Sequence, residues 1–412
     1  MKILFVCHRV PFPPKRGGKI RPFNIIRHLS GCGHEVTVAS LARNAEELEA
    51  AVGLRQHCAR SLVEIVPDSA AWGRMLARIP TPTPSSFGYF HSPRLNRRIR
   101  AEVATQSYDS IFVHCSSVAP YVENILGVPK ILDFGDMDSQ KWREYSVHRS
   151  WPKSAVYHLE ALKLENTERR LGRKFDYCTC TTRAEWETLA QLGITTPSGW
   201  FPNGVDTQFF EPVQAADYDS NRIAFVGRMD YYPNQQAVLA FCRDVLPSLQ
   251  AWRPVVRLDI VGADPSGAIR ELGAIPGVTV TGTVPDVRPY VTHAALTIAP
   301  LAIARGTQNK ILESMAMGVP VVCSPQAAGG VDAIPGEHIL VAATPQENLA
   351  AIKAVLESKD MRHRFAVAAR ARVLSHHTWP NSMKQLDRLL AEASHTYRAK
   401  AVPGQPSTSQ NR

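Results

Sequence analysis

The sequence predicts two consecutive α/β domains, each built on a parallel β-sheet. Short apolar segments with β-branched residues alternate with helical patterns, and this alternation restarts after a turn cluster near residue 200. The order strand, loop, helix, strand is the βαβ unit, which implies parallel strands. The length of 412 residues suits two domains. In such sheets ligands bind at the carboxyl ends of the strands, and a cleft between two domains is the default site.

The first half begins with an apolar segment at residues 3–7, which is followed by a Pro- and Gly-rich loop that contains Gly17 and Gly18. A helical pattern then runs from Ile20 to Leu29. Further buried strands are expected at residues 36–39, 61–66, 110–113 and 130–134.

The second half repeats this organisation. Several of its expected strands end in glycine, as at Gly227, Gly262 and Gly282. Helices are expected at residues 238–249 and 309–317. The expected strands are residues 223–226, 257–261, 278–281, 296–299 and 319–323.

These patterns predict the domain boundaries. Residues 1–200 form the first domain, residues 201–378 the second, and a helix at residues 379–398 crosses back to the first. Residues 399–412 are polar, contain Pro, Gly and Ser, and are expected to be disordered.

Composition and charge narrow the functional classes. Apolar residues make up 44% and charged residues 20%, which is ordinary for globular proteins. The 47 basic and 37 acidic side chains give a net charge of +10, which favours anionic partners such as phosphates, a lipid surface or nucleic acid. A nucleic-acid partner is not expected, because no helix-turn-helix, zinc-finger or RNA-recognition signature is present.

The sequence also predicts a cytoplasmic protein. Its start lacks the long apolar region and cleavage site of a signal peptide. The longest weakly polar segment, residues 294–304, is shorter than the roughly 18 to 20 residues that span a bilayer. The eight cysteines are scattered without a C-x-x-C pair, so we expect reduced, buried thiols and no zinc site.

Residues 305–320 contain the strongest constellation of candidate site residues. Gly306 allows a tight turn ahead of a helix start, and the free amides of a helix N-terminus favour an anion such as a diphosphate. Lys310 and Glu313 are three residues apart and share a helix face. Lys310 can meet a phosphate while Glu313 accepts two hydrogen bonds from a ribose diol. The alternative is a surface pair on an amphipathic helix.

Four other candidate residues lie at or after the ends of expected strands or at the start of the first helix. Arg228 is placed to hold a leaving diphosphate, unless it is a solvated loop residue. Gly17 and Gly18 let the backbone approach a phosphate, although their spacing matches neither the dinucleotide-binding motif nor the P-loop. His114 ends a strand, where it either faces the cleft or has a structural hydrogen bond.

Asp136 and Asp138 form a D-x-D pair, a pattern that can hold a divalent metal on a nucleotide diphosphate. The basic residues named above would replace such a metal. We therefore expect no metal, with Asp136 facing the cleft.

Four segments together resemble the group 1 glycosyltransferases: residues 201–206, residues 225–229 with Pro233 and Asn234, residues 280–284, and residues 310–320. The Gly17-Gly18 loop and residues 133–142 resemble more narrowly the bacterial sugar transferases associated with exopolysaccharide and exosortase (PEP-CTERM) gene clusters. The resemblance covers residues 1–395.

This resemblance implies the GT-B fold, in which two Rossmann-like parallel-sheet domains face each other across a cleft. Acceptors then bind the first domain and nucleotide sugars the second. By position, Arg228 and Lys310 match the basic pair at the departing diphosphate, and His114 matches the histidine at the donor sugar. The donor-binding set comprises Gly17, Gly18, Asp136, Gly282, Thr283, Gly306, Thr307 and Glu313.

Two departures from the family pattern stand out. Phe112 replaces the first histidine of D-x-x-H-x-H, which begins at Asp109. Arg305 replaces the first glutamate of a pair separated by seven residues, whose second member is Glu313. The second change affects the residue that would contact the donor sugar, so the identity of that sugar stays open.

The implied activity is a retaining, metal-independent transfer of a hexosyl group from a nucleotide-diphosphate sugar to an acceptor hydroxyl, without a cofactor. The expected acceptor is a saccharide or lipid-linked saccharide in exopolysaccharide biosynthesis. The alternatives are a GT-B-fold epimerase or hydrolase and a basic, non-enzymatic protein that binds nucleic acid or a membrane surface. The base, the linkage and the oligomeric state stay open.

Residues 72–100 predict a peripheral contact with anionic lipid on the inner face of the plasma membrane. This segment holds six arginines and no acidic residue, with Trp72, Phe87, Tyr89 and Phe90 interspersed. The alternative is a solvated basic loop. The expected contact residues are Arg94, Arg97, Arg98 and Arg100.

Overall fold

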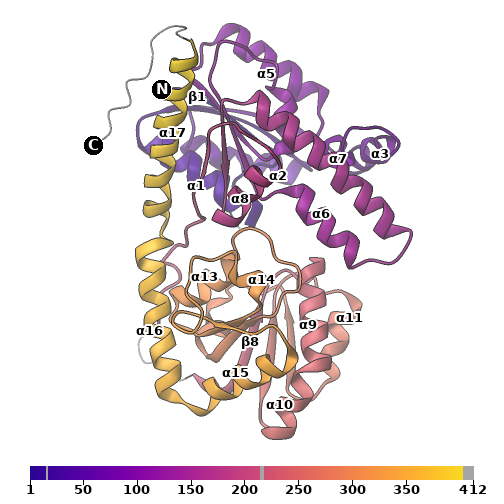
Figure 1. The fold of residues 1–412 in the computed structure, drawn as a ribbon, viewed down its shortest axis with the longest axis vertical. Helices are drawn as coiled ribbons and strands as arrows, with labels where there is room; N and C mark the ends of the chain where they lie inside the picture. The colour runs from indigo at the N-terminus through magenta and orange to yellow at the C-terminus, as the bar shows by residue number, and fades with distance from the viewer. Residues whose placement is uncertain (15–16, 214–217, 402–412) are drawn as a thin grey trace. The chain divides into compact units, whose positions relative to one another are not determined.

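The computed structural model describes residues 1–14, 17–213 and 218–401 (Figure 1). The chain forms two compact units. Unit 1 comprises residues 1–201 together with the segment that begins at Met383, and unit 2 comprises Pro202–Ser382. Each unit has its own parallel sheet, so the prediction of two parallel-sheet α/β domains is confirmed.

Unit 1 contains a seven-stranded sheet in the order β3-β2-β1-β4-β5-β6-β7. Its central strands are buried on both faces, which explains their continuous apolar sequences. Phe5 and Phe112 stack on neighbouring strands with their ring centroids 5.2 Å apart. The strands are β1 (Lys2–Cys7), β2 (Glu35–Ala42), β3 (Arg60–Ile65), β4 (Ser110–His114), β5 (Lys130–Gly135), β6 (Tyr177–Cys180) and β7 (Ser198–Trp200).

Helices cover the sheet of unit 1 and bury its apolar side chains. The α-helices are α1 (Gly17–Gly31), α2 (Ala45–Ala50), α3 (Asp68–Ala77), α4 (Ser85–Tyr89), α5 (Pro93–Thr105), α6 (Asp138–Val147), α7 (Lys153–Lys174) and α8 (Arg183–Gln191). Two 3₁₀ helices, η1 (Ala51–Gln56) and η2 (Ser116–Tyr121), complete the layer.

Unit 2 contains a six-stranded sheet in the order β10-β9-β8-β11-β12-β13. The strands are β8 (Asp219–Val226), β9 (Arg257–Val261), β10 (Val278–Gly282), β11 (Ala294–Ala299), β12 (Val321–Cys323) and β13 (Leu340–Val341). The helices are α9 (Tyr232–Asp244), α10 (Leu246–Trp252), α11 (Gly267–Glu271), η3 (Leu272–Ala274), α12 (Arg288–Thr292), α13 (Asn309–Ala316), α14 (Pro325–Ala328), α15 (Pro345–Glu357) and α16 (Lys359–His376).

The expected strands and helices are present, with three kinds of difference. The single helix expected at residues 238–249 is two helices that meet at Val245, because Pro247 has no N–H with which to continue the first helix. The strand expected at residues 319–323 begins only at Val321, after Pro320. Strands β6, β7 and β13 were not predicted; β7 and β13 have three and two residues.

The last helix, α17 (Trp379–Ala401), begins in unit 2 and continues in unit 1. Within unit 1, Glu392 accepts a hydrogen bond from the Tyr177 hydroxyl at 2.7 Å, and Asp387 contacts His28 at 2.8 Å. Leu389 packs closely on Gly199: a Cβ at residue 199 would lie 2.5 Å from Leu389 Cδ2. The expected disorder from residue 399 is wrong for residues 399–401, which are helical, and residues 402–412 lie outside the described residues.

Two further expectations concern cysteines and membrane spans. Six of the eight cysteines are buried as expected, whereas Cys32 is exposed and Cys115 is intermediate. No helix in the described part of the chain is long and apolar enough to cross a membrane.

Candidate active site

Each sheet reverses its direction of winding at one position, and the candidate residues gather there. In unit 1 the chain proceeds from β1 to one side and then returns to place β4 on the other; in unit 2 the same reversal separates β9 from β11 around β8. Loops diverge at such a switch point and leave a crevice at the carboxyl ends of the strands. His8 follows β1 and His114 ends β4, while Arg228 follows β8 and Lys310 follows β11.

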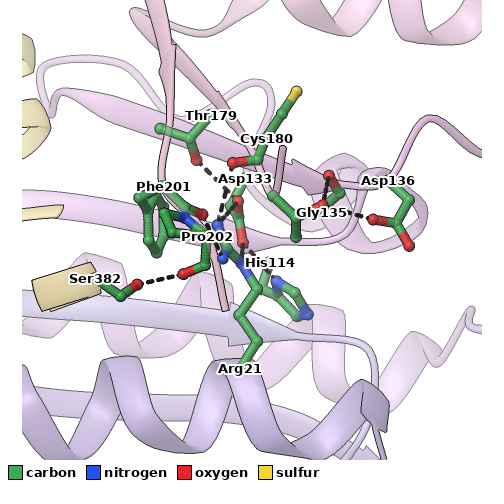
Figure 2. Close-up of polar contacts among 11 residues, drawn as sticks. Arg21, His114, Asp133, Gly135, Asp136, Thr179, Cys180, Phe201, Pro202 and Ser382 are labelled. Atoms are coloured by element: carbon green, nitrogen blue, oxygen red, sulfur yellow. Dashed lines mark hydrogen bonds and ion pairs between the residues drawn. The ribbon is translucent and has the colours of Figure 1, made fainter. Parts of the chain in front are cut away.

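Asp133 on β5 anchors the candidate residues of unit 1 (Figure 2). Its carboxylate accepts hydrogen bonds from Arg21 Nε and Nη2, each at 2.9 Å, and from the Thr179 hydroxyl at 2.9 Å. A fourth bond of 2.7 Å comes from His114 Nδ1. Four bonds satisfy this fully buried carboxylate and connect α1, β4, β5 and β6.

Arg21 supplies the counter-charge from helix α1. Its guanidinium also donates to the Phe201 carbonyl at 2.9 Å and lies 3.7 Å from the centroid of the Phe201 ring. Although burial alone would raise the pKa of Asp133, Arg21 and His114 lower it far below its ordinary value. Asp133 is therefore ionised at neutral pH.

His114 is oriented by this carboxylate. Because ionised Asp133 can only accept, Nδ1 of His114 donates in this bond, and Nε2 is the ring nitrogen left for another contact. The ring of His8 lies 5.8 Å from the ring of His114. Burial and the nearby positive groups lower the pKa of His8 well below its usual value, and its Nδ1 is buried without a partner in the described residues.

Two glycines leave space beside these rings. A Cβ at Gly18 would lie 3.9 Å from His8 Nε2, and one at Gly135 would lie 3.7 Å from His114 Cε1. Gly17 has no atom within 4 Å of such a Cβ. Helix α1 thus begins beside His8, and β5 ends beside His114.

Asp136 lies in the same region, and its Oδ1 accepts a hydrogen bond of 2.7 Å from the Thr181 hydroxyl. Burial raises the pKa of Asp136 above its ordinary value. Its D-x-D partner Asp138 contacts Lys141 at 2.6 Å. Among the described residues, no group of three His, Cys, Asp or Glu side chains is placed to hold a metal ion.

Asn234 connects the candidate residues of unit 2. Its amide nitrogen donates to the Arg228 carbonyl at 2.8 Å, and its Oδ1 accepts a bond of 2.7 Å from Lys310 Nζ. Lys310 Nζ also lies 4.5 Å from the centroid of the Phe225 ring. Lys310 and the loop after β8 are thereby held together.

Glycines at the strand ends permit this close arrangement. A Cβ at Gly227 would lie 2.7 Å from the Asn234 amide nitrogen and 3.0 Å from Lys310 Nζ. Gly262 has φ +151° and packs against Gly227. A Cβ at residue 262 would lie 1.7 Å from the Gly227 carbonyl oxygen. Only glycine fits these two positions.

Lys310 and Glu313 have opposite pKa shifts with a common cause. Burial lowers the pKa of Lys310 to about 7 and raises the pKa of Glu313 to about 7, while their mutual attraction partly opposes both shifts. Both groups are therefore partly neutral near pH 7. A bound anion would favour the charged form of Lys310.

Arg228 is held by two carboxylates. Its Nε lies 2.9 Å from Asp230 Oδ1, and its Nη2 lies 2.7 Å from Asp264 Oδ2. Its hydrogen bond to Asp230 raises the pKa of Arg228 above its ordinary value, so the guanidinium stays charged. Arg228 is thus a partly exposed loop residue whose guanidinium has two ion-pair partners.

The remaining predicted donor residues occupy two loops. Gly306, with φ +63°, precedes α13, and Thr307 Oγ1 is buried without a partner in the described residues. Gly282 ends β10, the edge strand, and Thr283 after it is exposed. Because β10 is two strands from β8, these two residues lie roughly 10 Å from the strand that precedes Arg228.

The sequence analysis did not identify the residues that form hydrogen bonds with the predicted site residues and orient them. Asp133 and Arg21 orient His114, and Asn234 joins Arg228 to Lys310. Asp133 stands inside an apolar strand, where a charged residue needs a partner; this was the available signal. The partner itself is 112 residues away, so no local pattern identifies it.

The predicted membrane segment is helical. Arg94, Arg97, Arg98 and Arg100 are all exposed on α5, but Arg98 contacts Glu64 at 2.6 Å. The expected mixture of basic and aromatic side chains at the surface is partly wrong. Phe87 is buried and the ring of Phe90 packs against His8 because both belong to the interior of unit 1, whereas Trp72 is half exposed.

Both halves of the sequence match known families. Residues 16–209 match the family described as Glycosyltransferase Family 4, and residues 220–358 match the family described as Glycosyl transferases group 1. A comparison with curated protein sequences gave no match.

Solved structures share the fold at low sequence identity. A sucrose-phosphate synthase from Thermosynechococcus elongatus is 16% identical with a TM-score of 0.71, and the alignment covers 95% of this chain and 100% of that one. HepE from Anabaena in complex with UDP and glucose is 16% identical with a TM-score of 0.68, at 95% and 100% coverage. TarM from S. aureus, in complex with UDP among other ligands, is 9% identical with a TM-score of 0.66, at 94% and 99% coverage.

The buried Asp133 gives the first testable prediction. The variant Asp133→Asn leaves Arg21 buried without a counter-charge, so we expect unfolding by urea at pH 7 to require about 3–5 kcal/mol less than in the wild type. The difference should narrow as the pH falls below about 4, because the wild type then loses the stability that depends on an ionised Asp133.

The control variant is Asp387→Asn, which removes an exposed partner of His28 and should change the stability little. A difference between Asp133→Asn and the wild type that stays constant down to pH 3 would contradict the assignment of an ionised anchor.

Proposed function

Because the chain is a glycosyltransferase of the GT-B type, we propose that it transfers a sugar, with retention of anomeric configuration, from a nucleotide-diphosphate donor to an acceptor hydroxyl. UDP-sugars are the first donors to test, because structures of the Anabaena protein HepE hold UDP and UDP-glucose. The acceptor we propose is a saccharide or lipid-linked saccharide in exopolysaccharide biosynthesis, bound by unit 1.

The observation that carries this proposal is the basic pair beside an acidic residue at the unit 2 switch point. Lys310 is held by Asn234 at 2.7 Å, and Arg228 occupies the same loop system. Glu313 lies on the helix face of Lys310, where a carboxylate can accept hydrogen bonds from a ribose diol. A nucleoside diphosphate presents both matching groups, the anion and the diol.

In the reaction, the bond between the sugar C1 and the donor phosphate oxygen breaks while a bond from C1 to the acceptor oxygen forms on the same face. The acceptor proton passes to the departing phosphate. Negative charge grows on that phosphate, and Lys310 and Arg228 stabilise it more strongly in the transition state than in the bound donor. Fixed cations of the chain thus perform the role that a metal ion has in other transferases.

His114 is proposed to orient the donor sugar. Asp133 fixes the ring through Nδ1, which leaves Nε2 for a contact with a sugar hydroxyl. Gly17, Gly18 and Asp136 would contact the donor from unit 1, and Gly306, Thr307, Gly282 and Thr283 from unit 2.

Removing the Lys310 cation should slow turnover without unfolding the protein. We expect Lys310→Ala to release nucleoside diphosphate from the donor about 100- to 1000-fold more slowly than the wild type, since one preorganised donor of charge stabilisation is lost. The control is Lys353→Ala, a lysine of the same unit that packs over Trp252 and should keep full turnover. Near-wild-type turnover by folded Lys310→Ala would refute the assigned role.

We also propose a peripheral contact between unit 1 and anionic lipid on the inner face of the plasma membrane. Arg94, Arg97 and Arg100 are exposed on α5 and form no ion pair with any described residue. Trp72 of α3 is 51% exposed. Three unpaired cations suit a layer of anionic headgroups.

Sedimentation with anionic vesicles tests this contact. Each arginine near such a surface contributes about 1 kcal/mol, so replacing Arg94, Arg97 and Arg100 by Gln should weaken binding roughly 100-fold at low salt. A matched variant replaces three arginines elsewhere, Arg183, Arg243 and Arg364, by Gln and should bind like the wild type. Equal binding by both variants would reject α5 as the contact.

A further inference from the structure

Unit 1 contains a cavity of about 460 Å³ that the donor residues do not line. Helices α4, α5 and α7, the 3₁₀ helix η2 and the end of α3 surround it. Phe90 belongs to its wall and packs edge-on against His8, with ring centroids 5.2 Å apart. Phe90 therefore separates the cavity from the candidate residue His8 of the same unit.

One side of the cavity is aromatic and rigid. Phe87 and Tyr121 are buried and line it with Phe90. The Tyr121 hydroxyl accepts a hydrogen bond of 2.6 Å from the Ser92 amide and donates one of 2.8 Å to the Phe90 carbonyl. Because both bonds are satisfied within the protein, this wall offers a ligand its apolar ring faces rather than a polar group.

The other side presents polar groups that the protein leaves unused. Arg78, Asn96 and Asn166 line the cavity, and none of their side chains has a hydrogen bond or ion pair with another residue in the described part of the chain. In contrast, the second arginine of the lining, Arg170, is paired with Glu123. Arg78 is thus the cation available to a ligand.

The lowered pKa of His91 is consistent with a positive charge on Arg78 at the cavity. His91 also lines the cavity, and burial together with the charges of Arg78 and Arg74 lowers its pKa. The carboxylate of the lining, Glu123, is paired with Arg170 and Lys174. An acidic group on a ligand would neutralise the charge of Arg78.

An exposed apolar strip leads to the cavity along α7. Leu162 is one helical turn before Asn166 and Leu159 is nearly two turns before it, and they are 42% and 44% exposed. Helix α7 contacts the end of α3, where Lys163 Nζ donates to the Arg78 carbonyl at 3.2 Å. Leu76, two residues before Arg78, is 56% exposed.

We propose that this cavity binds the acceptor of the proposed transfer as an acidic amphiphile. The acidic group lies at Arg78, the amides of Asn96 and Asn166 bond its polar groups, and the apolar part follows Phe87, Leu162 and Leu159. The inference depends on the proposed function for the role of the ligand, but the binding itself can be measured without turnover.

Calorimetry with decyl phosphate below its micellar concentration tests the proposal, with saturating UDP present to occupy any diphosphate site. We expect Arg78→Gln to weaken binding about 10- to 100-fold, as for the loss of a charge-assisted hydrogen bond. Asn166→Ala should weaken it less, and Arg183→Gln, a surface control, should not change it. Neutral decyl maltoside should bind more weakly and be insensitive to Arg78→Gln.

The proposal would be overturned by equal binding by Arg78→Gln and the wild type, by loss of binding in Lys310→Ala, or by equal affinity for inorganic phosphate and decyl phosphate. The last result would mean a free phosphate site without an apolar component. A protein that binds UDP but not decyl phosphate would refute this inference and leave the proposed transferase function intact.

Discussion

The candidate residues of unit 1 depend on one buried carboxylate. Asp133 lies in the middle of a parallel sheet, a place where a charge is costly unless every lone pair is used. Arg21, Thr179 and His114 use them all, and these partners come from three other elements of the fold. The hydrogen bonds that stabilise the buried charge of Asp133 also fix the ring of His114 and the start of α1.

In unit 2, a neutral side chain holds the cationic group of Lys310. The Asn234 side chain has an NH₂ group, which donates to the Arg228 carbonyl, and a carbonyl oxygen, which accepts from Lys310. Lys310 can therefore be buried near an anion site without a permanent carboxylate partner in hydrogen-bond contact. Burial lowers its pKa to about 7, and a nearby anion would favour its charged form. Arg228, with two aspartates, keeps its charge throughout.

The sequence was sufficient for the fold and for the placement of Lys310 and Glu313 on one helix. Apolar strands and glycines at strand ends predict parallel sheets, and the spacing of Lys310 and Glu313 predicts a shared helix face. It was insufficient for residues that act through others, since Arg21 and Asp133 meet only after the chain has folded. It also failed where a strand has two or three residues, as in β7 and β13, because so short a segment has no periodicity.

The central claim, that side chains of this protein rather than a metal hold a nucleoside diphosphate, can be tested by thermal unfolding in EDTA with UDP, GDP and ADP. A ligand at about 100 times its dissociation constant adds about 2.7 kcal/mol to the stability of the protein. The account predicts that one nucleotide raises the unfolding midpoint in EDTA and that Glu313→Ala abolishes the increase. No increase with any nucleotide, or an increase that requires added Mg²⁺ or Mn²⁺, would contradict it.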